Sequence, residues 1–291
     1  MTRKFKLSMK YLGFIILLIL FGIYKNSINP YIYKNVDLVG MIKPLVLTFM
    51  SLLGALLGVV LRNVKNIKND FKKIISKNKT LFLETLLFVS IIPISSNPIT
   101  VFLLTFIWTR FLYRLKLNNI ALVGLTLIGL NFLLKSNIYQ NSREMLLFNN
   151  YSTMDMFFGM NVGGLFATNI CIILIAYFVL SLEKVYKKEI VFSAVLTFFV
   201  ISIVASIFSG NYENILPGLY SHNILFIFVF ILPDLNSSCY TRGGKVLSGV
   251  VAGALSYALV PLITYAAPLI SVLFVSIFKE YIDKFFLKKS L

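Results

Sequence analysis

The chain has 291 residues, of which 58% are hydrophobic and only 13% are charged, whereas charged residues make up about 25% of a typical soluble domain. The formal net charge is +17 at pH 7, because 28 Lys and Arg residues outnumber 11 Asp and Glu residues. These basic residues form short clusters between apolar runs, a pattern typical of a membrane surface and not of a nucleic-acid-binding domain. We therefore expect a multi-pass protein of the cell membrane that binds no nucleic acid.

Ten apolar stretches follow along the chain. A helix needs about 20 apolar residues to cross a hydrocarbon core about 30 Å thick. The first stretch follows a basic N-terminus without a small-residue cleavage site, so we expect it to be a retained first span. The sequence predicts an all-α fold with transmembrane helices at 9–24, 38–61, 80–93, 98–115, 118–134, 156–182, 189–208, 218–232, 245–262 and 265–279.

Basic residues divide unevenly between the two sides of this arrangement. Lys and Arg beside a span tend to stay in the cytoplasm. If the N-terminus is cytoplasmic, ten spans leave only five basic residues on the outer side, and both termini are cytoplasmic. Those five are Lys25, Lys34, Lys43, Lys135 and Arg143.

Two short spans, 80–93 and 218–232, end in related sequences, FVSIIPISS at 88–96 and FVFILPDLN at 228–236. A proline removes a backbone donor and favours a helix end just before it. Five spans per half is an odd number, so the two halves must enter the membrane with opposite polarity. The sequence therefore predicts two inverted five-helix repeats, 1–135 and 156–291, joined by an outer loop at 136–155.

Polar residues follow both prolines, Pro93 and Pro233. Backbone groups freed inside lipid need protein or water as partners, and acidic residues there often mark ion paths. Two alternatives remain open, a polar turn at 93–98 and an ion pair between Asp234 and Arg242. The residues that we predict to line an ion or substrate path are Ser95, Ser96, Asn97, Asp234, Asn236, Ser237 and Ser238.

Three stretches resemble the RnfD/NqrB family of membrane subunits from ion-translocating redox complexes. Residues 221–251 resemble the family's Thr-Asp-Pro-Val-Thr-Ser-Pro and Arg-Gly motifs, with Asp234, Ser237, Arg242 and Gly243 in the matching places. Residues 84–124 resemble its Leu-Pro-Pro break and its Asn-Pro-Phe-Asn-Pro-Ala motif, of which Asn119, Ala121 and Gly124 are present. Residues 154–169 resemble its glycine-rich stretch.

The resemblance implies a fold similar to that of urea transporters, with two inverted five-helix halves. It also implies a subunit of a flavin-dependent complex that couples electron transfer to Na⁺ or H⁺ translocation. Such a subunit works with other membrane subunits and is not a stand-alone enzyme, so no catalytic residue is expected in this chain. No metal ligand is expected either, because the sequence has no zinc-ligand motif and a single histidine cannot build a metal cluster. The alternatives are a flavin-free channel or transporter for a small solute with the same architecture, and a flavin-free scaffold for other subunits.

The cofactor implied by the resemblance is FMN or riboflavin. Family members attach FMN to a threonine in a Ser-Gly-Ala-Thr-type motif before span six, and this motif is absent here. Thr153 is the only threonine in that loop, and a helix N-cap is the alternative role for Ser152 or Thr153. For the glycines of span six, close helix packing is the alternative. The candidate cofactor contacts are Thr153, Asn119, Gly159 and Gly163.

Overall fold

The computed structural model describes residues 3–33, 36–63, 74, 76, 78–113, 115–133, 152–161, 163–210, 215–263 and 265–288. Within them every regular element is a helix, which confirms the all-α class. Three stretches are long and apolar enough to cross a membrane, Lys6–Ile32, Leu38–Arg62 and Lys188–Ser209, and Pro98–Leu112, Asn119–Asn131 and Ile170–Ser181 are shorter apolar helices.

The helices lie close to the predicted spans. The first half contains α1 (Arg3–Ile23), which continues through a π-helical turn (Tyr24–Ile28) into α2 (Asn29–Ile32), then α3 (Leu38–Arg62), α5 (Lys79–Ile91), α6 (Pro98–Ile107) with a π-helical turn (Trp108–Leu112), and α7 (Asn119–Leu133). The second half contains α9 (Thr153–Phe157), α10 (Ile170–Ser181), α11 (Lys188–Ser209), α12 (Ile215–Tyr220), α13 (Ile224–Phe226) with a π-helical turn (Ile227–Ile231), α14 (Arg242–Leu259) and α15 (Ala267–Lys288).

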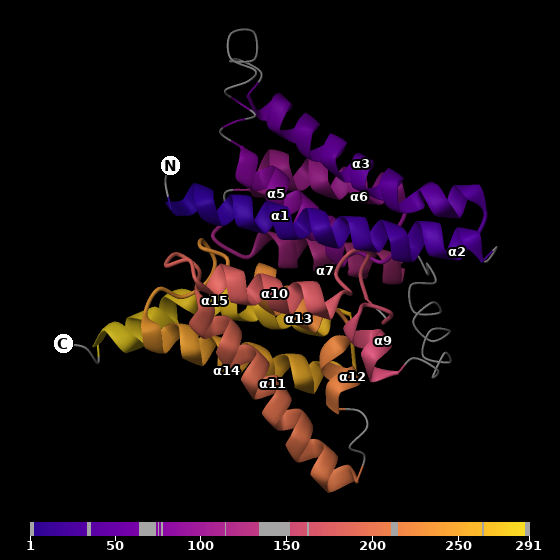
Figure 1. Cartoon of the computed structure of the whole chain (residues 1–291). Coiled ribbons are helices and arrows are strands. Elements are labelled where there is room, and N and C mark those ends of the chain that lie inside the picture. The colour runs from indigo at the N-terminus through magenta and orange to yellow at the C-terminus, as the bar shows by residue number, and fades with distance from the viewer. Residues whose placement is uncertain are drawn as a thin grey trace.

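Two tightly packed helix pairs lie at opposite edges of the molecule, α3 with α6 and α11 with α14, and the remaining long helices lie between them (Figure 1). Both pairs use glycines four residues apart. A Cβ atom on Gly54 or Gly58 of α3 would collide with threonine hydroxyls of α6 and of the π-helical turn that follows it. A Cβ atom on Gly249 or Gly253 of α14 would collide with α11. Small residues at such positions let helix backbones approach closely, as is common in membranes.

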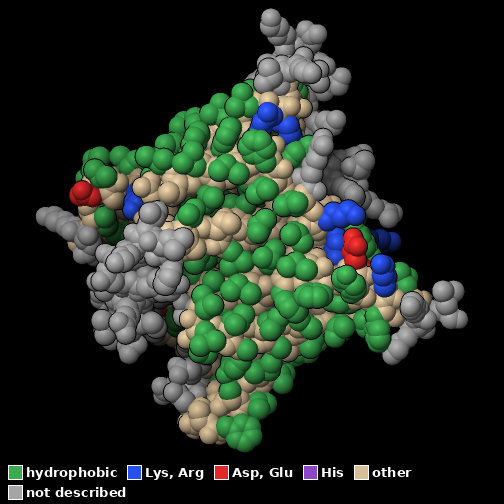
Figure 2. Space-filling model, turned by 180° about the vertical axis from the view of Figure 1, so that it is seen from behind, with side chains coloured by type: hydrophobic (Ala, Val, Ile, Leu, Met, Phe, Trp, Pro, Cys, Tyr) green, Lys and Arg blue, Asp and Glu red, His purple; other side chains and the backbone are tan. Residues whose placement is uncertain are grey.

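The outer surface of the bundle is suited to lipid. Hydrophobic side chains cover most of the face shown in Figure 2, and few charged side chains interrupt it away from its margins. Phe208 at the end of α11 is 87% exposed, and Phe49 and Phe178 are also exposed. A soluble protein rarely exposes apolar patches of this extent. Together with the apolar helices, this surface supports a multi-pass membrane protein.

The half-length helices α5 and α13 lie antiparallel near the centre of the bundle. Asn223, just before α13, donates a hydrogen bond to the carbonyl of Ile91 at the end of α5. At their other ends, Glu84 of α5 and Asp234 beyond α13 line the same cavities. The two proline breaks therefore lie at opposite ends of the bundle, as an inverted repeat requires. The full ten-span repeat stays a prediction.

The start of α1 and the end of α15 lie at one end of the bundle (Figure 1), here called the terminal end. The break at Pro233 lies at this end, because Lys284 and Leu287 of α15 line a cavity together with Asp234. The break at Pro93 lies at the far end. An even number of spans places both termini on the same side, and this arrangement agrees with the predicted number.

The prediction of one continuous span at 156–182 is wrong. The chain forms only the short α9, then non-helical stretches at 158–161 and 163–169, and then α10. Gly159 has a φ of +103°, which favours glycine and interrupts a helix. Gly163 and Gly164 lie in the second non-helical stretch, so the reading of these glycines as helix-packing positions is also wrong. The helix resumes where the Asn169 side chain accepts a hydrogen bond from the Ile172 N–H.

The predicted span at 218–232 is also interrupted. His222 and Asn223 adopt left-handed backbone conformations, with φ values of 57° and 62°, between α12 and α13. Asparagine tolerates this conformation better than most residues. His222, an isolated histidine near a predicted span end, is buried against the ring of Tyr265.

Candidate functional site

The first break, at the end of α5, is closed by protein. The carbonyl of Ser90 accepts from the Phe166 N–H at 3.1 Å, and that of Ile92 accepts from the Leu165 N–H at 2.8 Å. The Asn223 amide donates to the Ile91 carbonyl at 3.2 Å. The non-helical segment thus supplies partners for the backbone groups that the helix end frees.

Close backbone approach makes this junction tight. A Cβ atom on Gly164 would lie 2.5 Å from the Ser90 carbonyl oxygen and 2.6 Å from Ile91 backbone atoms. The Gly164 N–H also donates to the Asn223 side-chain oxygen at 2.5 Å. No side chain fits at residue 164 without moving α5.

The three predicted path residues after Pro93 form a turn between α5 and α6. Asn97 is exposed and accepts from the Ile99 N–H at 2.9 Å, which makes it the N-cap of α6. Ser96 is buried, and its hydroxyl has no partner among the described residues. Ser95 is half-buried. None of the three lines the cavities at the second break, and the geometry favours the polar turn that was the alternative for 93–98.

Carbonyls are also freed at the second break, and side chains from other helices bind them. The Tyr186 hydroxyl donates to the Val229 carbonyl at 2.9 Å. The Asn118 amide donates to the Ile231 carbonyl at 3.0 Å and lies 3.1 Å from the Ser237 hydroxyl. Asn118 also caps α7, because its side-chain oxygen accepts from the Ala121 N–H.

Two neighbouring cavities adjoin this second break. The larger, of about 680 Å³, lies between α5, α7, α15 and the loop after Pro233. The smaller, of about 220 Å³, extends toward α1 and includes Ser8 and Tyr11. The residues that line both are Thr80, Glu84, Ile120, Asp234 and Asn236.

Two carboxylates in these shared walls have unpartnered oxygens. Asp234 Oδ2 accepts from the N–H groups of Asn236 and Ser237, at 3.2 and 2.9 Å, and from the Ser237 hydroxyl at 2.7 Å. Within the described chain, Asp234 Oδ1 and the Glu84 carboxylate have no hydrogen bond or ion pair. Asn119 Oδ1, buried in the wall of the larger cavity, has no partner there either. These oxygens are free to bind water, a proton or a cation.

The ion pair between Asp234 and Arg242 is not found, although the structure describes both residues. Backbone N–H groups and Ser237 hold the Asp234 carboxylate instead. Ser237 and Ser238 are buried, and their hydroxyls bond within the loop, whereas Asp234 and Asn236 reach the cavities. The structure thus brings together Asp234, Asn236 and Asn119 at one cavity.

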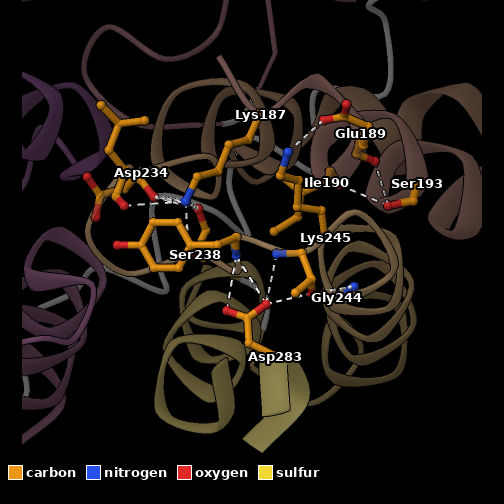
Figure 3. A network of polar contacts seen from close by, with 12 residues as sticks. Lys187, Glu189, Ile190, Ser193, Asp234, Ser238, Gly244, Lys245 and Asp283 are labelled. Carbon is orange, nitrogen blue, oxygen red and sulfur yellow. Dashed lines mark hydrogen bonds and ion pairs between the residues drawn. The ribbon is translucent and has the colours of Figure 1, made fainter. Parts of the chain in front are cut away.

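Two lysines bind the loop that follows Pro233, and Figure 3 shows one of them, Lys187. Lys187 Nζ lies 2.7 Å from the Ser238 hydroxyl and 2.8, 3.3 and 3.5 Å from the carbonyl oxygens of Ser238, Leu235 and Asp234. Burial lowers the pKa of Lys187 to about 8. From α15, Lys279 donates to the carbonyl of Asn236.

The remaining candidates lie toward the far end. Thr153 is exposed in the first turn of α9, and Ser152 is the N-cap, as the alternative reading predicted. Asp155 completes a capping box with Ser152. A Cβ atom on Gly159 would meet the Phe21 ring, and one on Gly163 would meet Asn223 and Thr168. Thr153, Gly159 and Gly163 therefore do not share a site with Asn119.

Sequence reasoning missed Glu84, Asn118 and Lys187. Glu84 carried a usable signal, because it is the one acidic residue inside the predicted span at 80–93 and intramembrane carboxylates are functional candidates by default. No such signal marked Asn118 and Lys187 in the sequence. Each lies at the start of a helix, and the residues that it binds are distant in the sequence.

A comparison with protein families matches residues 8–291 to the NQR2, RnfD, RnfE family. No match was found among curated proteins. The family match spans nearly the whole chain, including both breaks and both cavities, and confirms the resemblance seen in the motifs. With its apolar helices and lipid-compatible surface, the chain belongs to the NQR2, RnfD, RnfE family, as a membrane subunit of the kind found in ion-translocating electron transport complexes.

Proposed function

We propose that this subunit carries a step of the Na⁺ or H⁺ movement that is coupled to electron transfer in its complex. The observation that carries the proposal is the pair of carboxylates, Glu84 and Asp234, which line both cavities and have oxygens without a protein partner. The subunit acts with other membrane subunits of the complex.

The chemistry of these side chains suits a small cation. A carboxylate in the walls of a membrane protein is unfavourable unless water, a proton or a cation compensates it. Asn119 adds a neutral oxygen to the same cavity wall, and oxygen ligands are those that hard cations prefer. Either carboxylate can also hold a proton, so the site accommodates both proposed coupling ions.

The proposed route of the cation follows from the difference between the two ends of the bundle, one with a cavity and one closed. The larger cavity reaches the terminal end, which we propose to be cytoplasmic, so a cation would arrive at Glu84 and Asp234 from that side. Hydrogen bonds from Phe166, Leu165 and Asn223 close the far end in this conformation. Onward passage would therefore require this junction to loosen.

The test replaces each carboxylate by its amide, Glu84→Gln and Asp234→Asn, in the complete complex in inverted membrane vesicles. Uptake of radioactive sodium and acidification of the lumen are measured while electrons flow. We expect either substitution to lower coupled uptake of one of the two ions about 10–100-fold, the range typical when a group supporting a bound metal is removed.

Glu280→Gln is the matched control. Glu280 lines the same cavity, but it is exposed and lies 3.7 Å from Lys116, and such surface pairs contribute little. Uptake should stay near the unmodified level in this variant. Normal uptake of both ions by Glu84→Gln and Asp234→Asn, in assembled complexes, would refute the proposal.

A flavin tethered to Thr153 does not fit the surroundings of this residue. A phosphodiester there would place a negative charge beside Asp155, whose carboxylate already occupies the N-terminus of α9. We therefore propose a subunit without a covalent flavin at Thr153, which keeps the flavin-free transporter as the second candidate. A visible spectrum of the purified chain tests it, since bound flavin would absorb and fluoresce.

A further inference from the structure

We infer that Lys187 is a positioning residue, which together with Tyr186 holds loop 234–238 so that Asp234 keeps a free oxygen toward the cavities. The inference rests on the proposed function, because it concerns the same carboxylate. It adds that the connector between α10 and α11, which lines neither cavity, determines how the cation site is presented.

The two neighbouring side chains bind both sides of the break at Pro233. The Tyr186 hydroxyl binds the Val229 carbonyl, before the proline, at 2.9 Å. Lys187 Nζ binds carbonyl oxygens after the proline, from Asp234 to Ser238. A single dipeptide therefore fixes the helix end and the following loop relative to each other.

Because Lys187 is buried, its ammonium group depends on hydrogen bonds to the protein. The residue is only 6% exposed, and a buried ammonium group is costly unless it is fully hydrogen-bonded. Its oxygen contacts, together with the Tyr240 ring 4.6 Å away, compensate the charge. Loss of the ammonium would leave several loop oxygens without this donor, so the loop would have to rearrange or admit water.

The contacts of Lys187 leave the carboxylate of Asp234 available to a cation. Lys187 approaches the backbone carbonyl of Asp234 and not its carboxylate. N–H groups of the loop and the Ser237 hydroxyl donate to Asp234 Oδ2, and Asp234 Oδ1 has no hydrogen-bond partner among the described residues. A lysine paired with the carboxylate would compete with the transported cation, whereas this arrangement fixes the loop without occupying the site.

The experiment compares Lys187→Met, Lys187→Arg and the control Lys188→Met in the complete complex. Lys188 is the next residue along the chain but is exposed. Two quantities are measured, coupled cation uptake and the labelling rate of Cys239 by a thiol reagent. Cys239 follows the loop and is fully buried, so its labelling reports loop opening. A Cys171→Ala background removes the other cysteine.

We expect Lys187→Met to lower uptake about 10-fold, as is typical when a residue that orients a ligand is removed, and to label Cys239 about 10-fold faster through local opening. Lys187→Arg should recover part of both effects, because it keeps a charged donor. Lys188→Met should match the unmodified complex. Tyr186→Phe, which removes one hydroxyl, should raise labelling more weakly.

Unchanged uptake and labelling in Lys187→Met would overturn the inference. If that variant does not assemble, Tyr186→Phe decides, since it keeps the bulk of the side chain. Labelling of Cys239 at the unmodified rate in Tyr186→Phe would then overturn the inference. Loss of uptake in Asp234→Asn with normal Lys187 variants would refute the positioning role but leave the proposed function intact. Normal uptake in both Asp234→Asn and Glu84→Gln would refute the proposed function itself.

Discussion

The two proline breaks end half-length helices in matching sequence contexts, yet their surroundings differ. At Pro93, backbone N–H groups of a non-helical segment and the Asn223 amide donate hydrogen bonds to the carbonyl oxygens that the end of α5 leaves unpaired. At Pro233, the Asn118 and Tyr186 side chains bind the freed carbonyls, and two cavities with unpartnered carboxylate oxygens adjoin the loop.

A proline break therefore specifies where a helix ends but not what surrounds the exposed backbone. One break is a packed junction in which any loss of complementarity should be costly. The other adjoins a polar cavity where water can replace a lost partner. Substitutions of equal chemistry at the two ends should therefore have unequal effects, and four predictions follow from this comparison in order of expected size.

Gly164→Ala should cause the largest loss of stability. The new methyl group would press on the backbone of α5 at Ser90 and Ile91. Backbone atoms cannot rotate away, so we expect a cost of about 3 kcal/mol, the upper end of the range for overpacking. Thermal unfolding in detergent measures the loss. Gly129→Ala is the control, because a Cβ atom there would meet nothing within 4 Å. Equal melting temperatures for the two variants would show that the junction is not tight.

Asn223→Ala should destabilise the protein more than Asn118→Ala. The first change removes two buried hydrogen bonds and forces alanine into a left-handed conformation, for a cost of about 2–3 kcal/mol. The second change also removes hydrogen bonds, to the Ile231 carbonyl, the Ser237 hydroxyl and the Ala121 N–H. It causes no backbone strain, and water in the cavity that Asn118 lines can replace part of them, so it should cost about 1–2 kcal/mol. Asn223→Gly separates the two causes, because it loses the same two hydrogen bonds but adopts the left-handed conformation without strain. The reverse order in thermal unfolding would break the comparison.

The two serines should differ less, and in the opposite order. Ser237→Ala removes a hydroxyl that bonds the Asp234 carboxylate at 2.7 Å and should cost about 1 kcal/mol. Ser96→Ala removes a buried hydroxyl that has no partner among the described residues and should be neutral or slightly stabilising. Denaturation of both variants in the same detergent measures the sign of each change in the free energy of unfolding.

Thr153→Ala should have the smallest effect. Ser152 and Asp155 form the cap of α9 without Thr153, so folding and ion uptake should be unchanged. Fluorescence of the denatured protein on a gel measures covalent flavin, and neither the unmodified chain nor the variant should show any at this position. A fluorescent band that disappears in Thr153→Ala would restore the tethered flavin.

Much of the fold followed from the sequence for simple physical reasons. Apolar runs of the right length between basic clusters predicted helices that lie close to the observed ones, because lipid allows few other structures. The prolines marked the ends of α5 and α13 correctly. The prediction of the sixth span was wrong because its apolar residues indicated a helix. Instead, Gly159, Gly163 and Gly164 lie in non-helical stretches, and N–H groups of the second stretch bind carbonyls at the end of α5.

Part of the site could also be predicted. Asp234 and Asn236 were chosen because polar residues after a break in lipid need a wet or protein partner, and both reach a cavity. Ser95, Ser96 and Asn97 met the same criterion, yet they form a turn away from it. The distinction depends on which helices pack beside each loop.

The membrane class, the positions of most helices and the two proline breaks could be predicted from the amino-acid sequence, since these features depend on local apolarity and on backbone rules. The packing of the helices was needed to show that Glu84 lines the same cavities as Asp234 and that Lys187 binds loop carbonyls rather than a carboxylate. Those contacts join residues roughly 50 to 150 positions apart, and the packing of whole helices sets such distances, which no local pattern encodes.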